Sequence, residues 1–333
     1  MDTSKKVFVT GSTGFIGSVL ITKLLERGFS VRALKRSVPA TPQPNLDYMT
    51  GDITDKESLR KGMSGCEYVF HLAAYAKNWA SDPKIYTKIN IEGTQNVFAV
   101  ARDLNVQRVV WTSTFVTFGF TPPGVIGNEQ MPRHSEHCFT EYERTKTVME
   151  REAADWVKNG LPLVIVNPTR VFGPGVLSES NSVTKLIDHY RRGVFPILLN
   201  RGRNIGNYGF IDDVAEGHIA AMERGRIGER YILGGENVSL QKLLQTADNV
   251  DGKKRFQMKI FWLIPMLVAH YLNLQAKCLG IYPLITPGWV RTFLADWVFS
   301  CEKAERELGY RITPFEEAMR QTCRWLDETA SAA

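Results

Sequence analysis

Short apolar runs rich in β-branched residues recur along the first half of the chain, and stretches with helical spacing separate them. In one such stretch Val19, Leu20 and Leu24 recur as on the inner face of a helix. Unbroken apolar runs are typical of strands buried on both faces of a parallel sheet. The pattern therefore predicts an α/β fold with parallel strands near residues 6–10, 30–35, 47–50, 67–71, 107–112 and 162–167.

The regular alternation of strands and helices ends after Pro168, and shorter elements follow. We therefore predict a first domain over residues 1–174 and a smaller C-terminal lobe formed by residues 175–203 and 235–333. Two later apolar segments, near residues 206–212 and 229–234, are predicted to be strands that return to the main sheet.

One stretch, residues 260–269, is strongly apolar. It is too short to span a bilayer, which takes about twenty residues, and it contains Pro265. We therefore predict no integral membrane segment. We favour a helix that covers the smaller lobe, and the alternative is an apolar lid or membrane-surface contact that admits an apolar substrate. Aromatic residues nearby favour an apolar substrate: Trp289, Phe293, Trp297 and Phe299.

Residues 10–17 read Thr-Gly-Ser-Thr-Gly-Phe-Ile-Gly and join the first predicted strand to the first predicted helix. Strand, glycine turn and helix in this order are typical of a dinucleotide fingerprint. Gly11 allows the tight turn, Gly14 lets the backbone approach a pyrophosphate, and Gly17 lets helix pack on strand. The helix N-terminus favours the phosphate charge. These residues predict a Rossmann-type doubly wound parallel sheet, with the smaller lobe binding the substrate.

A second motif, Tyr142-x-x-x-Lys146, places a phenol and an ammonium on one face of a helix. The ammonium is expected to favour the phenolate and to lower the pKa of Tyr142, as an acid–base catalyst near neutral pH requires. The motif follows a predicted strand that ends in Thr112, Ser113 and Thr114. Ligands bind at the carboxyl ends of strands in doubly wound sheets, so these hydroxyls are candidate site residues.

Glycine turn, strand-end hydroxyl and Tyr-x-x-x-Lys, in that order, resemble the extended short-chain dehydrogenase/reductase superfamily, also called the NAD-dependent epimerase/dehydratase superfamily. The resemblance covers nearly the whole chain. It is strongest to dihydroflavonol 4-reductase-like and 3β-hydroxysteroid dehydrogenase-like proteins, and to hopanoid-associated sugar epimerases. Further matching segments are Gly51-Asp52-Ile53, His71-Leu72-Ala73-Ala74, Asn90 to Asn96, Asn167 to Gly175, and Phe210 to Ala215.

The resemblance implies three catalytic residues: Thr114, Tyr142 and Lys146. Tyr142 would give a proton to a developing alkoxide, Lys146 would hold the nicotinamide ribose and tune Tyr142, and Thr114 would stabilise the growing charge. Because successive strand residues face opposite ways, we expect only one of Ser113 and Thr114 to face the nicotinamide, with Thr114 preferred. The implied cofactor-binding residues are Gly11, Thr13, Gly14, Phe15, Ile16, Gly17, Lys35, Arg36, Asp52, Ile53, Leu72, Ala73, Ala74, Asn90, Thr112, Ser113, Tyr142, Lys146, Asn167, Pro168, Thr169 and Val171.

The end of the second predicted strand indicates the cofactor. An NAD enzyme typically has Asp or Glu there, to accept hydrogen bonds from the ribose. This chain has Leu34, Lys35 and Arg36 instead. A guanidinium pairs with a 2′-phosphate, which a carboxylate would repel. We therefore expect NADP(H), with NAD(H) the less favoured alternative.

At two places this chain differs from motifs of the superfamily, and the differences restrict the reactions that we expect. Sugar 4,6-dehydratases follow the catalytic threonine with Asp and Glu, where this chain has Phe115 and Val116. Many nucleotide-sugar enzymes carry an Arg-Asp-aromatic element where this chain has residues 207–209, Asn-Tyr-Gly. Arg201 or Arg203 could replace the missing charge. Both departures favour a neutral ketone or alcohol over a nucleotide sugar.

We predict an NADP(H)-dependent oxidoreductase that interconverts a ketone and a secondary alcohol on a small, apolar or polycyclic substrate. A sugar or nucleotide-sugar epimerase or reductase is the alternative. A third hypothesis, a binding protein that does not turn substrate over, is disfavoured by the intact Tyr142 and Lys146.

Composition adds little to this picture. The net charge of +6 is spread along 333 residues, so we expect no nucleic-acid partner. The five cysteines form no Cys-x-x-Cys pair, which argues against a disulfide framework or a zinc ribbon and favours a reducing compartment. Because the first predicted strand begins near residue 6, we expect no signal peptide and a cytoplasmic location. We expect no metal and a small-molecule substrate, and a homodimer is the oligomeric state that we consider.

Overall fold

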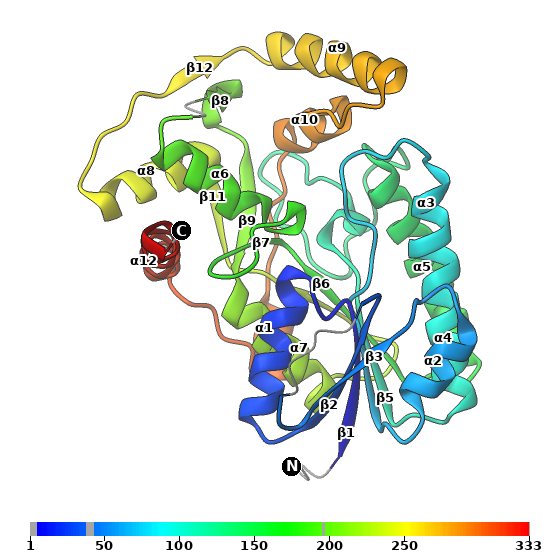
Figure 1. The fold of residues 1–333 in the computed structure, drawn as a ribbon. Coiled ribbons are helices and arrows are strands. Elements are labelled where there is room, and N and C mark those ends of the chain that lie inside the picture. Colours follow the sequence, from blue (N-terminus) through cyan, green and yellow to red (C-terminus); the bar gives the residue numbers. More distant parts are fainter. Residues whose placement is uncertain (1–4, 38–42, 195–196, 333) are drawn as a thin grey trace.

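The computed structural model describes residues 5–37, 43–194 and 197–332 (Figure 1). Its centre is a seven-stranded parallel sheet in the order β10-β6-β5-β4-β1-β2-β3. The six strands predicted from the apolar runs are confirmed to within one residue at each end. The strands of this sheet are β1 (Lys6–Thr10), β2 (Ser30–Lys35), β3 (Leu46–Thr50), β4 (Tyr68–His71), β5 (Arg108–Thr112), β6 (Leu163–Pro168) and β10 (Arg230–Leu233).

Helices cover both faces of this sheet (Figure 1). On one face α1 (Phe15–Glu26) packs against α7 (Ile211–Arg224). On the other lie α2 (Lys56–Met63), α4 (Thr94–Asp103) and α5 (Glu141–Lys158). This arrangement confirms the predicted doubly wound α/β fold.

Strand alternation divides the core between the two faces. In β1, Val7 and Val9 belong to the cluster under α1 and α7, whereas Phe8 belongs to the cluster under α2, α4 and α5. In β5, Val110 faces the first cluster and Trp111 the second. A strand buried on both faces needs apolar residues at every position, which is why these segments are unbroken apolar runs.

Above the carboxyl ends of the sheet lie two small sheets (Figure 1). One contains β7 (Arg170–Phe172), β9 (Ile205–Phe210) and β11 (Glu236–Ser239), and the other contains β8 (Ile197–Leu199) and β12 (Met258–Ile260). The prediction that a strand near residues 206–212 returns to the main sheet is therefore wrong. The edge of β6 is taken by β10, so β9 pairs with β7 instead.

The other helices surround these small sheets. They are α3 (Lys84–Tyr86), which continues into a π-helical stretch (Thr87–Gly93), α6 (Ser182–Arg191), α8 (Leu240–Asp251), α9 (Leu263–Leu279), α10 (Pro287–Leu294), α11 (Glu302–Leu308) and α12 (Phe315–Ala332), with 3₁₀ turns at Phe115–Phe118, Glu179–Asn181 and Asn200–Gly202.

One helix of the predicted C-terminal lobe belongs elsewhere. α11 packs against α7 and β10, beside the main sheet. Its Ala304 and Leu308 are fully buried there, and the Lys303 ammonium donates to the Arg230 carbonyl oxygen at 2.8 Å. The segment 235–333 therefore does not form one continuous lobe, because this helix completes the cover of the main sheet.

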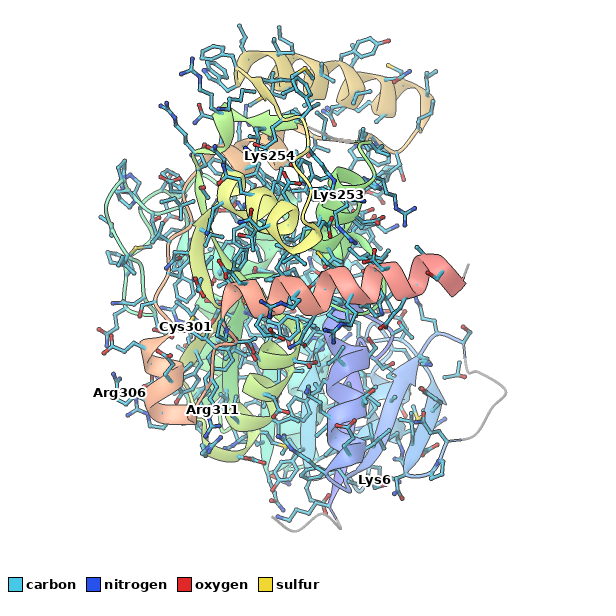
Figure 2. The ribbon with its side chains drawn as sticks, turned by 90° about the vertical axis from the view of Figure 1, so that its left-hand side faces the viewer. Lys6, Lys253, Lys254, Cys301, Arg306 and Arg311 are labelled. Carbon is cyan, nitrogen blue, oxygen red and sulfur yellow. The ribbon has the colours of Figure 1, made fainter. Side chains whose placement is uncertain are left out.

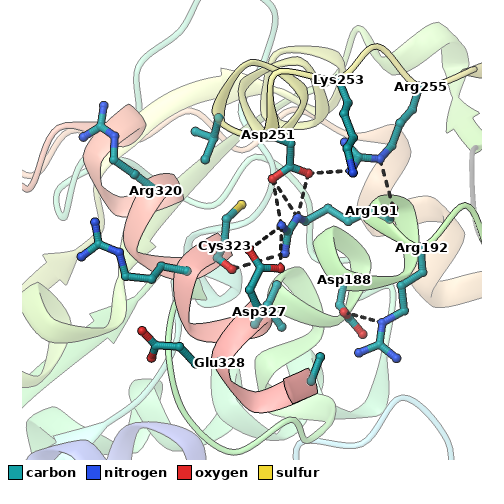
Figure 3. Close-up of a pocket in the computed structure, with 14 residues that line it drawn as sticks. Asp188, Arg191, Arg192, Asp251, Lys253, Arg255, Arg320, Cys323, Asp327 and Glu328 are labelled. Atoms are coloured by element: carbon teal, nitrogen blue, oxygen red, sulfur yellow. Dashed lines mark hydrogen bonds and ion pairs between the residues drawn. The ribbon is translucent and has the colours of Figure 1, made fainter. Parts of the chain in front are cut away.

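A network of ion pairs, which we call the ion network, joins α6, α8 and α12 around a cavity of about 610 Å³ (Figure 3). Arg191 of α6 donates to Asp251 of α8 at 2.8 Å and to Asp327 of α12 at 2.9 Å. Arg255 follows α8 and donates to Asp248 at 2.8 Å and to Asp251. Since each central charge meets an opposite one, the network fixes how these three helices pack.

Candidate active site

A cleft of about 580 Å³ lies at the carboxyl ends of the main-sheet strands. All the predicted catalytic and cofactor residues line it except Asn90 and Asn167. The glycine turn, the strand-end hydroxyls and the Tyr-x-x-x-Lys pair, which are far apart in the sequence, therefore meet in one place. Thr10 lines the cleft as well.

The glycine turn lies too close to its neighbours to accept side chains. Gly11 has φ +73°, and a Cβ there would lie 2.6 Å from the backbone nitrogen of Ala73. A Cβ on Gly17 would overlap the carbonyl oxygen of Gly11. The Gly14 N–H donates to that oxygen at 3.0 Å, and Gly14 caps α1. The open backbone at a helix N-terminus fits a dinucleotide pyrophosphate.

A buried histidine fixes the strand ends behind this turn. His71 Nδ1 lies 2.7 Å from the Thr10 hydroxyl, and its Nε2 lies 3.1 Å from the Thr94 hydroxyl. Burial lowers the pKa of His71 to about 3, and the nearby Lys146 adds to this effect. His71 is therefore neutral at pH 7 and holds the ends of β1 and β4 in register with α4.

The three predicted catalytic residues come together at one point. Thr114 follows the end of β5, and its side chain is hydrogen-bonded to Tyr142 on α5. Lys146 lies one turn further along α5, is almost fully buried, and donates to the carbonyl oxygen of Thr112 at 2.8 Å. Its ammonium also lies 5.0 Å from the centre of the Trp111 ring. The phenol and the hydroxyl can thus contact the same substrate oxygen.

The pKa values of this pair differ from the sequence-based expectation. Burial raises the pKa of Tyr142 to about 12, although its hydrogen bond with Thr114 acts in the opposite direction. Burial also lowers the pKa of Lys146 to about 7, against the attraction of Glu150. The expected lowering of the Tyr142 pKa is therefore wrong for the chain on its own, because burial disfavours the charged form of both groups.

The two strand-end hydroxyls both line the cleft. Our expectation that only one of them faces the nicotinamide assumed that the strand stays regular. The regular strand β5 ends at Thr112, so strict alternation of side chains no longer applies to Ser113 and Thr114. Thr114 bonds Tyr142, whereas the buried hydroxyl of Ser113 has no hydrogen-bond partner in the part of the chain that the structure describes. Thr114 thus lies beside Tyr142, and the hydroxyl of Ser113, in the wall of the cleft, is left without a partner among the described residues.

Asn90 and Asn167 lie behind the cleft wall and not on it. Asn90 accepts from the Tyr75 N–H at 2.7 Å and donates to the Thr145 hydroxyl at 3.0 Å, which ties the loop after β4 to α5. Asn167 donates to the Thr114 carbonyl oxygen at 3.0 Å and also to Glu150. Both amides fix the segments that carry Tyr142 and Thr114, and the sequence motif did not distinguish this role from direct contact with the cofactor.

The end of β2 presents two cations to the cleft. The Lys35 ammonium lies 3.6 Å from the centre of the Tyr48 ring, and Arg36 is exposed at the rim. Asp52, at the neighbouring end of β3, accepts from the Thr54 N–H at 2.9 Å. The side of the cleft at β2 therefore carries positive charge where an NAD enzyme typically carries a carboxylate.

The far wall of the cleft contains residues that the sequence motifs did not assign. The rings of Trp289 and Phe293 on α10 lie 4.3 Å apart, and the Arg170 guanidinium lies 4.4 Å from the Phe293 ring. Arg170 also donates to the Thr292 carbonyl oxygen at 2.9 Å. The sequence signal for this wall was the group of aromatic residues that includes Trp289 and Phe293, which favoured an apolar substrate. Further cleft residues without such a signal are Tyr75, Ile85, Ile89, Glu179 and Val183.

Residues 5–37, 43–194 and 197–332 contain no group of three or more His, Cys, Asp and Glu side chains that could hold a metal ion. Within the same ranges, no helix is both long enough and apolar enough to cross a membrane. The predicted absence of a signal peptide concerns residues 1–4, which lie outside the described residues.

Residues 7–234 match the model of the NAD dependent epimerase/dehydratase family. The chain belongs to this family. It is an NAD(P)-dependent oxidoreductase of the extended short-chain dehydrogenase/reductase type, as its motifs and the geometry of its cleft indicate.

Two curated relatives and one solved structure extend this result. The chain is 31% identical to a putative dihydroflavonol 4-reductase of Synechocystis, over 96% of this chain and 93% of the relative. It is 32% identical to sterol demethylase protein B of Methylococcus capsulatus, over 96% of this chain and 98% of the relative. The crystal structure of gox2253 superimposes with a TM-score of 0.81 at 30% identity, over 98% and 99% of the two chains.

Proposed function

We propose that this oxidoreductase uses NADP(H) to interconvert a ketone and a secondary alcohol on an apolar or polycyclic substrate. The observation that carries the proposal is the convergence of Thr114, Tyr142 and Lys146 on a cleft whose far wall is formed by Trp289 and Phe293. Two similar proteins are named for a dihydroflavonol and a sterol, both of which are polycyclic.

The proton chemistry follows from the side chains. NADPH, when bound, supplies a hydride to the carbonyl carbon. Because the pKa of Tyr142 is about 12, its phenol keeps its proton at neutral pH and can donate it to the carbonyl oxygen. Thr114 orients this phenol and stabilises the charge that develops on the oxygen. Lys146 contacts the end of β5 and would meet the ribose hydroxyls from there.

Other reactions of the superfamily have less support. Phe115 and Val116 stand where dehydratases place their acid and base, and the Phe115 ring packs 5.2 Å from the Trp297 ring. Asn207 is buried and donates to the Gly235 carbonyl oxygen at 2.8 Å. Arg201 and Arg203 are exposed and do not line the cleft. The chain thus lacks, at these positions, the groups for eliminating water or binding a sugar diphosphate.

The stoichiometry of NADPH tests the reaction. Purified protein should be incubated with NADPH and a panel of polycyclic ketones, aliphatic ketones and UDP-sugars. We expect one NADPH consumed per alcohol formed, and only with apolar ketones. Isomerisation of a UDP-sugar without net NADPH consumption would show that the chain is an epimerase.

The cofactor preference is tested at Arg36. Replacing Arg36 with Asp should weaken NADPH binding by about 2–4 kcal/mol, because a charge-assisted contact is lost and repulsion is added. NADH binding should change much less. Dissociation constants of both cofactors for both proteins give the answer, and equal constants in the native protein would exclude the preference.

Two further expectations stay part of this proposal: residues 175–203 with parts of 235–333 form the substrate lobe, and the protein is located in the cytoplasm. A homodimer is the oligomeric state to be tested. The five cysteines are free, which suits a reducing compartment. Light scattering of the purified protein measures the oligomeric state.

A further inference from the structure

The helix α9 has its large apolar residues on the outside. Its buried residues are Pro265, Ala269 and Ala276, which are small and share one face. The opposite face and the segments beside the helix carry large side chains that are exposed. We call these residues the apolar cap: Phe261, Trp262, Leu263, Ile264, Leu267, Val268, Tyr271, Leu274, Leu279, Ile281, Tyr282 and Leu284.

The cap lies at the outer edge of the molecule. Figure 1 shows α9 above α10, and Figure 2 shows side chains that project from this helix away from the rest of the chain. This differs from the helix that we favoured from the sequence, whose apolar residues would be buried. An exposed apolar surface of this extent marks an interaction site in a stable protein.

The segment that carries the cap is basic, and the carboxylate of Glu179, which accepts from the Tyr282 hydroxyl, comes from outside it. Residues 252–295 contain six lysines and arginines and no aspartate or glutamate. Lys259 on β12, Lys277 on α9 and Arg291 on α10 are exposed. Lys253 and Lys254 lie further away, in the loop after α8 (Figure 2), and Lys253 lines the cavity of the ion network. Arg255 itself belongs to the ion network. An apolar surface with basic residues around it is complementary to a bilayer with anionic headgroups.

A cavity beneath α9 leads towards the catalytic cleft. It has a volume of about 610 Å³ and is lined by His270, Asn273 and Lys277 of α9. Glu141 lines this cavity, and its neighbour Tyr142 lines the cleft. Asn78 lines both, so the two spaces adjoin there. An apolar molecule that enters at α9 would thus have a short path to the catalytic tyrosine.

We propose that the apolar cap docks on the surface of an anionic lipid bilayer. The apolar side chains enter the headgroup region, and the lysines contact the lipid phosphates. Docking places the cavity under α9 next to the membrane, from which an apolar ketone can reach Tyr142. This delivery role rests on the proposed function, whereas docking itself does not.

Two other occupants fit the same surface less well. A second copy of the chain, placed by a two-fold axis, would bring the same basic residues together and repel itself. Insertion across the bilayer is unsuited to a helix of 17 residues that contains Pro265 and Lys277.

Vesicle flotation of the full chain tests docking without substrate or NADPH. The probes are vesicles of phosphatidylcholine alone and of phosphatidylcholine with phosphatidylglycerol. We expect binding to the anionic vesicles, weaker binding to the neutral ones, and a decrease at high salt because screening weakens the lysine contacts. The double variant Leu267→Glu/Leu274→Glu should bind at least about a hundredfold more weakly.

The control variant is Ile126→Glu/Ile227→Glu, which charges exposed apolar residues away from the cap. The exposed fractions are 62% for Leu267, Leu274 and Ile126, and 51% for Ile227. The control should bind vesicles as the native chain does. Equal vesicle binding by the cap variant, or no binding by the native chain, would overturn the proposal. A native dimer that the cap variant dissociates, without vesicle binding, would assign the surface to a second copy.

The same variants separate docking from the proposed function. With a water-soluble ketone, the cap variant should retain native turnover, since its changes lie outside the catalytic cleft. Loss of vesicle binding with retained turnover supports docking alone. Vesicle binding without any ketone reduction would leave docking standing and refute the reductase.

Discussion

The catalytic cleft and the ion network on α6, α8 and α12 both bury ionisable side chains, but they stabilise them differently. In the network, Arg191 and Arg255 both meet the Asp251 carboxylate. In the cleft, the Lys146 ammonium meets the carbonyl oxygen of Thr112 and lies next to the Trp111 ring. The ion network thus stabilises the charged forms of its side chains. In the cleft, the charged form of Lys146 has no such carboxylate partner among the described residues and is only weakly stabilised.

The pKa values follow from this difference. Burial raises the pKa of Asp251, but the hydrogen bonds from Arg191 and Arg255 outweigh it and hold that pKa below its usual value. In the cleft burial prevails, so the pKa of Lys146 falls to about 7 and that of Tyr142 rises to about 12. Paired charges hold helices together, whereas weakly paired groups remain available for proton transfer.

The largest effect should come from Lys146→Ala. Turnover should fall by about 10³-fold or more, because the proton donor loses its neighbour, and NADPH binding should weaken as well. Lys158→Ala is the control, since Lys158 is exposed at the end of the same helix. Steady-state kinetics and NADPH titration of both variants test this. Equal losses in the two variants would mean that α5 is sensitive to any change in charge.

The ion network should respond in stability and not in chemistry. Asp251→Asn should lower the free energy of unfolding by about 3 kcal/mol, because two largely buried guanidinium groups lose the carboxylate that they share. Denaturant unfolding measures this loss, and KM for NADPH should stay unchanged.

Asp327→Asn is the matched control, because this second carboxylate partner of Arg191 is 67% exposed. It should cost less than about 1 kcal/mol. Because the pKa of Asp251 is lowered on folding, its stabilisation is present above the unfolded pKa of about 3.9. It is lost as the pH falls through the folded value. An Asp251→Asn protein with native acid stability would contradict this account of the network.

A smaller effect is expected at Thr114. Thr114→Ala should lower turnover by about 10²-fold, as for removal of one hydrogen-bond donor to a developing oxyanion. Thr114→Ser should retain most of the activity, since the hydroxyl remains. Comparison with Ser113→Ala separates the two hydroxyls in the same assay. If Ser113→Ala proved the more damaging change, the catalytic role would move to Ser113.

The strands and motifs of the first domain were predictable because the interactions that form them involve residues close together in the sequence. Strands β1, β4, β5 and β6 bury both faces and therefore appear as apolar runs, and the glycine turn carries its own steric requirement at Gly11 and Gly17. The motif at Tyr142 and Lys146 likewise fixes two side chains on one helix face. Such features can be predicted from the residues next to them in the sequence.

The remaining features depend on partners distant in the sequence. β9 has strand-like residues, but only the occupation of the β6 edge by β10 decides which sheet it joins. Asn90 and Asn167 belong to segments that match superfamily motifs, yet their hydrogen bonds point to Thr145 and Thr114 and not into the cleft. The α9 pattern indicated an apolar helix, but periodicity does not say whether anything covers its apolar face.

The central claim is that Tyr142 donates the proton in ketone reduction, and Tyr142→Phe tests it most directly. The ring and its packing remain, so only the proton donor is lost. Tyr68→Phe is the control, because Tyr68 is the first residue of β4 and lies at the end of the strand that points away from the cleft. Its hydroxyl accepts a hydrogen bond from the Lys5 ammonium there. We predict that Tyr142→Phe loses about 10²–10⁴-fold in kcat with NADPH and an accepted ketone, while its Kd for NADPH stays within the range of the control. Native turnover by Tyr142→Phe would contradict the assignment of this cleft as a reductase site.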